Sequence, residues 1–141
     1  MRVLLDTDVV LDVILAREPF AADSVQLFKL HDQQIIQGCV AAITPVNVFY
    51  FVRKFKSMGV ARQAVDLLLD SFTVCPLTAT VLRAAQALPI SDYEDAVQHA
   101  SGSAVGVEAI VTRNVDDYKN ATLPIFTPKD FLRHLNSGKA T

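Results

Sequence analysis

Acidic and amide side chains gather at a few places in this apolar sequence, and together they could do chemistry. In chain order they are Asp6 and Asp8, then Asp92, Glu94 and Asp95, then Asn114, Asp116 and Asp117. Carboxylates that converge on one pocket raise one another's pKa unless a divalent cation is bound. Mg²⁺ takes one or two carboxylates together with waters and phosphate oxygens. The pattern therefore indicates a cation site of the kind that activates a water and stabilises a phosphodiester's transition state.

Each of these acids, taken alone, has a simpler explanation. Asp6 could cap the helix that follows it, and Asp92 favours the dipole of its own helix. Ser91 and Glu94 have the spacing of a capping box. However, Asp92 and Asp95 stand three residues apart on one helical face, where they repel each other unless a positive charge lies nearby. The site hypothesis therefore depends on the three groups meeting in the fold.

The pattern of apolar residues predicts the elements that would bring the groups together. We expect strands at residues 2–5, 35–41, 72–76, 108–112 and 125–127. Helices are expected at 9–15, from about 20, at 44–58 with Thr44 as N-cap, at 60–69, at 78–88, from Ser91 to about 106, and at 127–135. Short apolar strands that alternate with helices predict an α/β, three-layer fold, with a short parallel sheet of four or five strands flanked by helices. In such sheets the working site lies beyond the carboxyl ends of the strands.

Length and composition limit what this protein can be. Its 141 residues fit a single domain, which we expect over residues 1–136, with a frayed tail at 137–141. The net charge of −2 attracts no nucleic acid by itself, so RNA binding would need a local basic patch and bound cations. Two cysteines without zinc spacing predict buried, reduced thiols. With no leader pattern and no apolar run long enough for a membrane, we expect a cytoplasmic protein.

Three motifs carry a resemblance to a known family. The segments 5–12 (LDTDVVLD), 92–96 (DYEDA) and 111–118 (VTRNVDDY) resemble those of the PIN-domain family, in the same order, and VapC-like toxins in particular. The resemblance covers nearly the whole chain. It implies a metal-dependent endoribonuclease that uses Mg²⁺ or Mn²⁺, the toxin of a type II toxin–antitoxin pair. It also implies RNA as substrate and a cognate antitoxin protein as partner, whose C-terminal segment occupies the groove.

The resemblance also implies roles for individual residues. The expected catalytic residues are Asp6, Asp92, Asp95 and Asp117. The expected metal ligands are Asp6, Asp95, Asp117, Asn114 and Asn47. Thr112 matches a small hydroxyl residue that helps to place the metal shell, and we count it with the substrate-binding residues. Arg113 lies within the last motif and is the candidate to meet a phosphate of the substrate.

One position departs from the family pattern. Asn47 stands where the family usually has Glu. Its carbonyl oxygen can still bind a hard cation but brings no charge, so metal affinity should be weaker. One alternative is therefore a catalytically weak PIN module that binds RNA or a protein partner.

A second alternative comes from the opening motif. Asp6 after an apolar strand also resembles the nucleophile of a haloacid-dehalogenase-like phosphatase. That family needs a later Lys, and this sequence has no Lys between Lys56 and Lys119. Apart from catalysis, the aromatic residues of 49–55 fall on one helix and are consistent with a homodimer.

Overall fold

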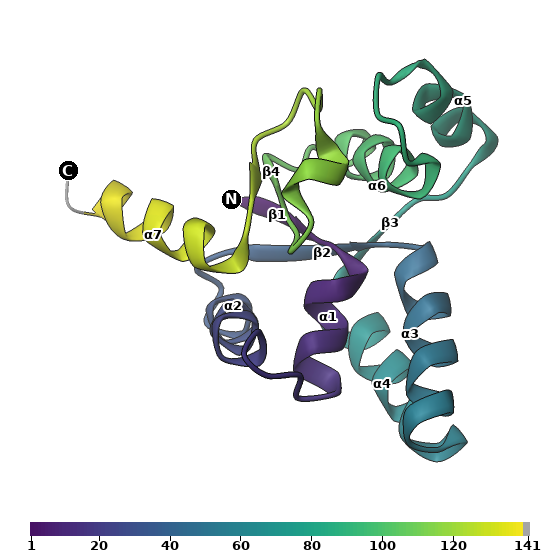
Figure 1. Ribbon diagram of the computed structural model, residues 1–141, viewed down its shortest axis with the longest axis vertical. Helices are drawn as coiled ribbons and strands as arrows, with labels where there is room; N and C mark the ends of the chain where they lie inside the picture. The colour runs from purple at the N-terminus through teal and green to yellow at the C-terminus, as the bar shows by residue number, and fades with distance from the viewer. Residues whose placement is uncertain (140–141) are drawn as a thin grey trace.

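A five-stranded parallel sheet forms the centre of the protein. The computed structural model describes residues 1–139 (Figure 1). The strands are β1 (Arg2–Leu5), β2 (Gln37–Ala41), β3 (Thr73–Cys75), β4 (Ala109–Val111) and β5 (Ile125–Phe126). Their order in the sheet is β3-β2-β1-β4-β5, and every neighbouring pair is parallel. The predicted fold class is confirmed.

The central strand, β1, lies at the point where the strand order reverses. Val3 pairs with Gly38 of β2 on one side, and Leu4 pairs with Ile110 of β4 on the other. The chain builds β1, β2 and β3 in one direction and then returns to place β4 and β5 beyond β1. In open parallel sheets such a switch point leaves a crevice outside the carboxyl ends of the two strands, where ligands bind. The crevice here lies after Leu5 and Val111.

Helices cover both faces of the sheet. They are α1 (Thr7–Ile14), α2 (Ala21–Asp32), α3 (Ile43–Phe55), α4 (Met58–Ser71), α5 (Ala79–Ala87), α6 (Tyr93–Ala104) and α7 (Pro128–Lys139), with a short 3-10 helix, η1 (Val115–Tyr118). Figure 1 shows α1 to α4 on one side of the sheet and α5 and α6 on the other. Alternate side chains of β1 pack on opposite faces of the sheet. Val3 and Leu5 pack with α1 to α4, whereas Leu4 packs with Ile110 and Cys39 on the other face. Both cysteines are buried and unpaired, as predicted.

The ends of α3 differ from the prediction. Thr44 is not the N-cap, because α3 already begins at Ile43. Its buried hydroxyl instead lies 2.9 Å from the hydroxyl of Thr7 and ties α3 to the start of α1. The helix predicted to continue to residue 58 ends at Phe55, and α4 begins at Met58, with Ser57 as N-cap. A hydroxyl near the N-terminus of a helix can form a hydrogen bond with another helix instead of capping its own, and sequence spacing does not reveal which of the two it does.

The last helix is longer than predicted. Apolar contacts of Phe131, Leu132 and Leu135 with the main core hold α7, which continues to Lys139. Residues 137–139, predicted as part of a frayed tail, are therefore helical, and residues 140–141 lie outside the described part of the chain. Within residues 1–139 no helix has both the length and the apolar character needed to cross a membrane.

Candidate active site

An acid-lined hollow opens at the carboxyl edge of the sheet, at the switch point. Six acids line it: Asp6, Asp8, Asp92, Glu94, Asp95 and Asp117. They come from the end of β1, the start of α1, the start of α6 and from η1. The three acidic groups that are far apart in the sequence therefore meet in one place. Asn114 and Arg113 also line the hollow.

Asp6 is the most strongly held of these acids. It is buried and forms the N-cap of α1, with Oδ1 accepting from the backbone N–H of Thr7 at 2.7 Å. The same oxygen accepts from Nε2 of Gln98 at 2.7 Å. Oδ2 accepts from the hydroxyls of Thr112, at 2.8 Å, and Tyr118, at 3.3 Å. Donors from four segments thus fix the carboxylate in one orientation, at the floor of the hollow.

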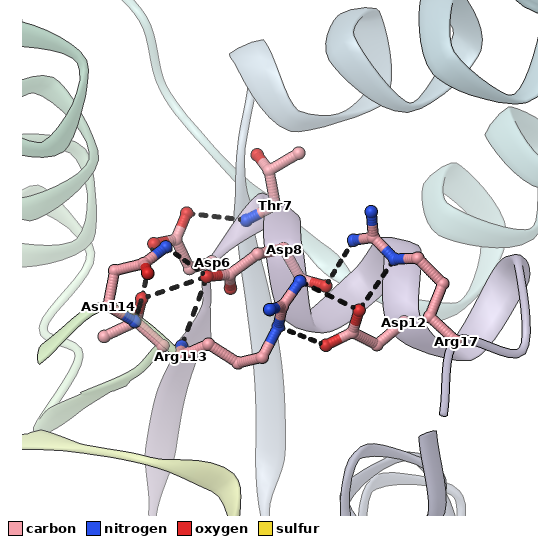
Figure 2. Close-up of polar contacts among 8 residues, drawn as sticks. Asp6, Thr7, Asp8, Asp12, Arg17, Arg113 and Asn114 are labelled. Atoms are coloured by element: carbon pink, nitrogen blue, oxygen red, sulfur yellow. Dashed lines mark hydrogen bonds and ion pairs between the residues drawn. The ribbon is translucent and has the colours of Figure 1, made fainter. Parts of the chain in front are cut away.

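Asp8, predicted to belong to the acidic group but not to be a catalytic residue or a metal ligand, lies beside Asp6. Its Oδ2 accepts from the backbone N–H of Arg113 at 3.2 Å and from the side-chain amide of Asn114 at 2.9 Å (Figure 2). Its Oδ1 is buried and has no hydrogen-bond partner within residues 1–139. Burial, and then the charge of Asp6, raise the pKa of Asp8 to about 6. Its position two residues after Asp6, within the first turn of α1, was the available signal.

Arg113 is held by an ion-pair network on the floor of the site. Its guanidinium lies 2.7 Å from Oδ2 of the fully buried Asp12, which also pairs with Arg17 at 2.8 Å (Figure 2). The ring of Phe20 stacks against the same guanidinium, with the centroid 4.0 Å from Cζ. A phosphate contact by Arg113 stays a prediction, since this geometry gives the side chain a structural partner first.

The acids of α6 crowd the first turn of that helix. Asp92 is the N-cap, with Oδ1 accepting from the backbone N–H of Asp95 at 3.1 Å, so the predicted capping box from Ser91 is wrong. An Asp accepts this bond as well as a Ser does, and here it lies one residue nearer the helix. Burial and then the charge of Asp6 raise the pKa of Asp95 to about 7, with smaller contributions from Asp92, Asp117 and Glu94.

Two predicted site residues do not line the hollow. Thr112 is buried beneath it and acts through Asp6, to which its hydroxyl donates. Asn47 lies on α3, and its Nδ2 donates to Oε1 of Glu94 at 2.9 Å. The role predicted for Thr112 in substrate binding and the role predicted for Asn47 as a metal ligand stay predictions. Gln98, which holds Asp6, was missed, although its position three residues after Asp95 puts it on the same side of α6.

The oxygen atoms in the hollow suit a hard divalent cation that retains some of its coordinated water molecules. Among residues 1–139, no three His, Cys, Asp or Glu side chains are arranged as a ready metal cage. Mg²⁺ does not need one, because it takes one or two carboxylates and retains several waters. Burial, and then the charges of neighbouring acids, disfavour the charged forms of Asp8 and Asp95 and raise their pKa values, and the buried Oδ1 of Asp8 has no hydrogen-bond partner within residues 1–139. A bound cation would stabilise these carboxylates in their charged form.

Known proteins share the fold of this chain. A family model for the PIN domain matches residues 2–116. A toxin–antitoxin complex from Klebsiella pneumoniae has a chain that is 20% identical, with a TM-score of 0.68 over 89% of this chain and 97% of that chain. A chain of DNA-bound VapBC from Salmonella typhimurium is 16% identical, with a TM-score of 0.69 over 91% of this chain and 98% of that chain. VapC20 of Mycobacterium tuberculosis, a toxin that cleaves the sarcin-ricin loop, is 12% identical, with a TM-score of 0.62 over 77% of this chain and 86% of that chain. At these identities the likeness is one of fold. No curated protein matches the sequence.

Proposed function

The chain belongs to the PIN-domain family, and from this premise we propose that it is a metal-dependent endoribonuclease, the toxin of a type II toxin–antitoxin pair. One observation carries the proposal: six acids line a hollow at the switch point of a parallel sheet. That is where ligands bind in such sheets. Family membership also sets aside the alternative of a haloacid-dehalogenase-like phosphatase with Asp6 as nucleophile.

The cation, Mg²⁺ or Mn²⁺, would be held by Asp6, Asp95 and Asp117. When bound, it supplies the positive charge that activates a water and stabilises the transition state of a phosphodiester. Asp6 is oriented for this task by its four donors. Asn114 is turned by its bond to Asp8, and its own carbonyl oxygen is a ligand suited to a hard cation.

The charge of the hollow supports metal dependence. Its two arginines, Arg17 and Arg113, share the single carboxylate of Asp12, so only one net positive charge stands against the six acids. An RNA phosphate would be repelled from such a surface unless cations were bound there. We therefore propose that the metal is needed for RNA to bind as well as for its cleavage.

The role as a toxin rests on relatives and on one exposed face. The chain from Klebsiella pneumoniae belongs to a toxin–antitoxin complex, and the chain from Salmonella typhimurium belongs to DNA-bound VapBC. In this chain α3 exposes Val46, Tyr50, Phe51 and Phe55, and Phe51 lines the hollow. Apolar side chains beside a charged cleft suit a protein partner, so we propose that an antitoxin covers them, in the cytoplasm. A homodimer could bury part of the same surface.

A cleavage assay with matched variants tests the proposal. Purified protein is incubated with RNA in Mg²⁺, in Mn²⁺ or in a chelator. Asp117→Asn is the main variant, because Asp117 is exposed and its loss leaves the hydrogen bonds of Asp6 in place. Asp116→Asn is the control, since Asp116 is the exposed neighbouring acid and does not line the hollow. Expression of each variant in bacteria, with growth as the readout, tests the toxin role.

We expect cleavage only with the divalent ion, loss of cleavage in Asp117→Asn and retention in Asp116→Asn. Bacterial growth should stop on expression of the wild type or of Asp116→Asn, and it should continue on expression of Asp117→Asn. Cleavage that persists in chelator, or in Asp117→Asn, would contradict the proposed mechanism. Mn²⁺ binding without any RNA cleavage would favour the catalytically weak PIN module.

A further inference from the structure

A hydrogen bond between two helices joins Asn47 and Glu94 at one side of the hollow. Asn47 belongs to the first half of α3, and Glu94 to the first turn of α6. Nδ2 of Asn47 donates to Oε1 of Glu94 at 2.9 Å. Glu94 lines the hollow, whereas Asn47 does not. The carboxylate on this side of the hollow therefore comes from α6, and α3 supplies the neutral partner.

We propose that Glu94 is a carboxylate ligand for the cation of the hollow and that Asn47 is its positioning residue; this inference rests on the proposed metal-dependent function. An amide suits the second task because its nitrogen donates to a carboxylate and brings no competing charge. It binds only one of the two oxygens of Glu94. Within residues 1–139 the other oxygen, Oε2, has no bonded partner and is available to a cation.

The pair also accounts for the neutral residue on α3. If position 47 carried a Glu, its carboxylate would face that of Glu94 across a hydrogen-bond distance, and two such groups repel. One carboxylate and one carboxamide keep the total charge of this side of the hollow at −1. The Asn at position 47 then does not mean one acid fewer at the site, because the acid is placed on the neighbouring helix.

The competing explanation is that Glu94 serves only the helix. A carboxylate in the first turn of α6 interacts favourably with the helix dipole. The hydrogen bond from Asn47 would then only give the exposed Glu94 side chain a partner. Under that explanation the replacement of Glu94 changes the stability of α6 slightly and leaves metal affinity unchanged. The two explanations thus differ in metal binding, which can be measured without RNA.

Calorimetric titration of Mn²⁺ into the full chain separates them, with the Mn²⁺-induced rise in melting temperature as a second readout. Glu94→Gln should weaken Mn²⁺ binding about tenfold or more, since it removes a charged ligand and keeps the shape. Asn47→Ala, which keeps Glu94 but releases it, should weaken binding by a smaller factor. Asp116→Asn is again the matched control, because it removes one exposed acid outside the hollow.

A reversed pair gives the sharpest result. In the double variant Asn47→Glu with Glu94→Gln, the carboxylate moves to α3 and the amide to α6, with the charge unchanged. Affinity for Mn²⁺ should return to within about threefold of the wild type, which a purely structural role for Glu94 would not produce. The inference is overturned if Glu94→Gln binds Mn²⁺ as tightly as Asp116→Asn, or if the reversed pair binds no better than Glu94→Gln. A wild type that binds no Mn²⁺ would overturn the proposed function and this inference together.

Discussion

Removal of a single charge should make the metal-free protein more stable at pH 8. The change is Asp95→Asn, in the half-buried first turn of α6. The pKa of Asp95 is about 7 in the folded protein, against an ordinary value of 3.8, because burial and the nearby acids disfavour its charge. A carboxylate with a raised pKa penalises the folded state above that pKa. The penalty is relieved as the pH falls from about 7 toward 3.8, because the folded state takes up the proton first.

The size of the effect follows from the two pKa values. A tenfold change in proton affinity corresponds to about 1.4 kcal/mol, so the difference between 3.8 and about 7 would amount to about 4 kcal/mol for a fully buried group. Asp95 is only half-buried, and solvent and salt screen the repulsion. We therefore expect a gain of about 1–2 kcal/mol in the free energy of unfolding, or about 3–8 °C in Tm.

Urea unfolding in a chelator, at pH 8 and at pH 5, measures this gain. Asp95→Asn should be more stable than the wild type at pH 8, and the gain should shrink to under half at pH 5. Mn²⁺ should stabilise the wild type at pH 8 more than the variant, because the variant has lost a proposed ligand. Asp116→Asn controls for the change in net charge. The reasoning fails if Asp95→Asn is no more stable than Asp116→Asn at pH 8, or if its gain is independent of pH.

Two further substitutions test the residues that support the site. Asp12→Asn leaves Arg17 and Arg113 facing a neutral side chain in a buried position, and the free energy of unfolding should fall by about 2–3 kcal/mol in urea; a loss below about 0.5 kcal/mol would show that the ion pairs are dispensable. Gln98→Leu removes a buried donor from Asp6, so Mn²⁺-dependent cleavage should fall about tenfold; unchanged cleavage would mean that the remaining donors suffice to orient Asp6.

The fold was predictable because its signals are strong and local. Short apolar strands alternate with helices along the whole chain, and that pattern has few solutions other than a parallel sheet covered on both faces. The details at helix ends were less predictable. Thr44 and Ser91 both have the residue type of an N-cap, but the hydroxyl of Thr44 is used across the core by Thr7, and Asp92 takes the place of Ser91. Which polar group satisfies which backbone atom depends on packing, and spacing alone does not contain it.

The candidate site shows the same division. Asp6, Asp95 and Asp117 could be found because each stands at a strand end or a helix start, positions that a parallel sheet brings to one edge. The support beneath them could not be found in this way. Asp12 and Gln98 are buried polar residues on α1 and α6, and each contacts a residue far away in the chain, Arg113 and Asp6 respectively. Only the three-dimensional arrangement tells a buried polar side chain with a partner from an ordinary exposed one.

The reversal of strand order at β1 also determines when the site can exist during synthesis. Asp6 leaves the ribosome early, but three of its four donors come from Gln98, Thr112 and Tyr118, which are made about a hundred residues later. The partial chain can pair β1 with β2 and β2 with β3, yet the side of β1 that later receives β4 stays empty. Contacts across such sequence distances form late, because a long loop must first be closed. A nascent chain therefore carries no assembled hollow, and its acids converge only when the last strands dock.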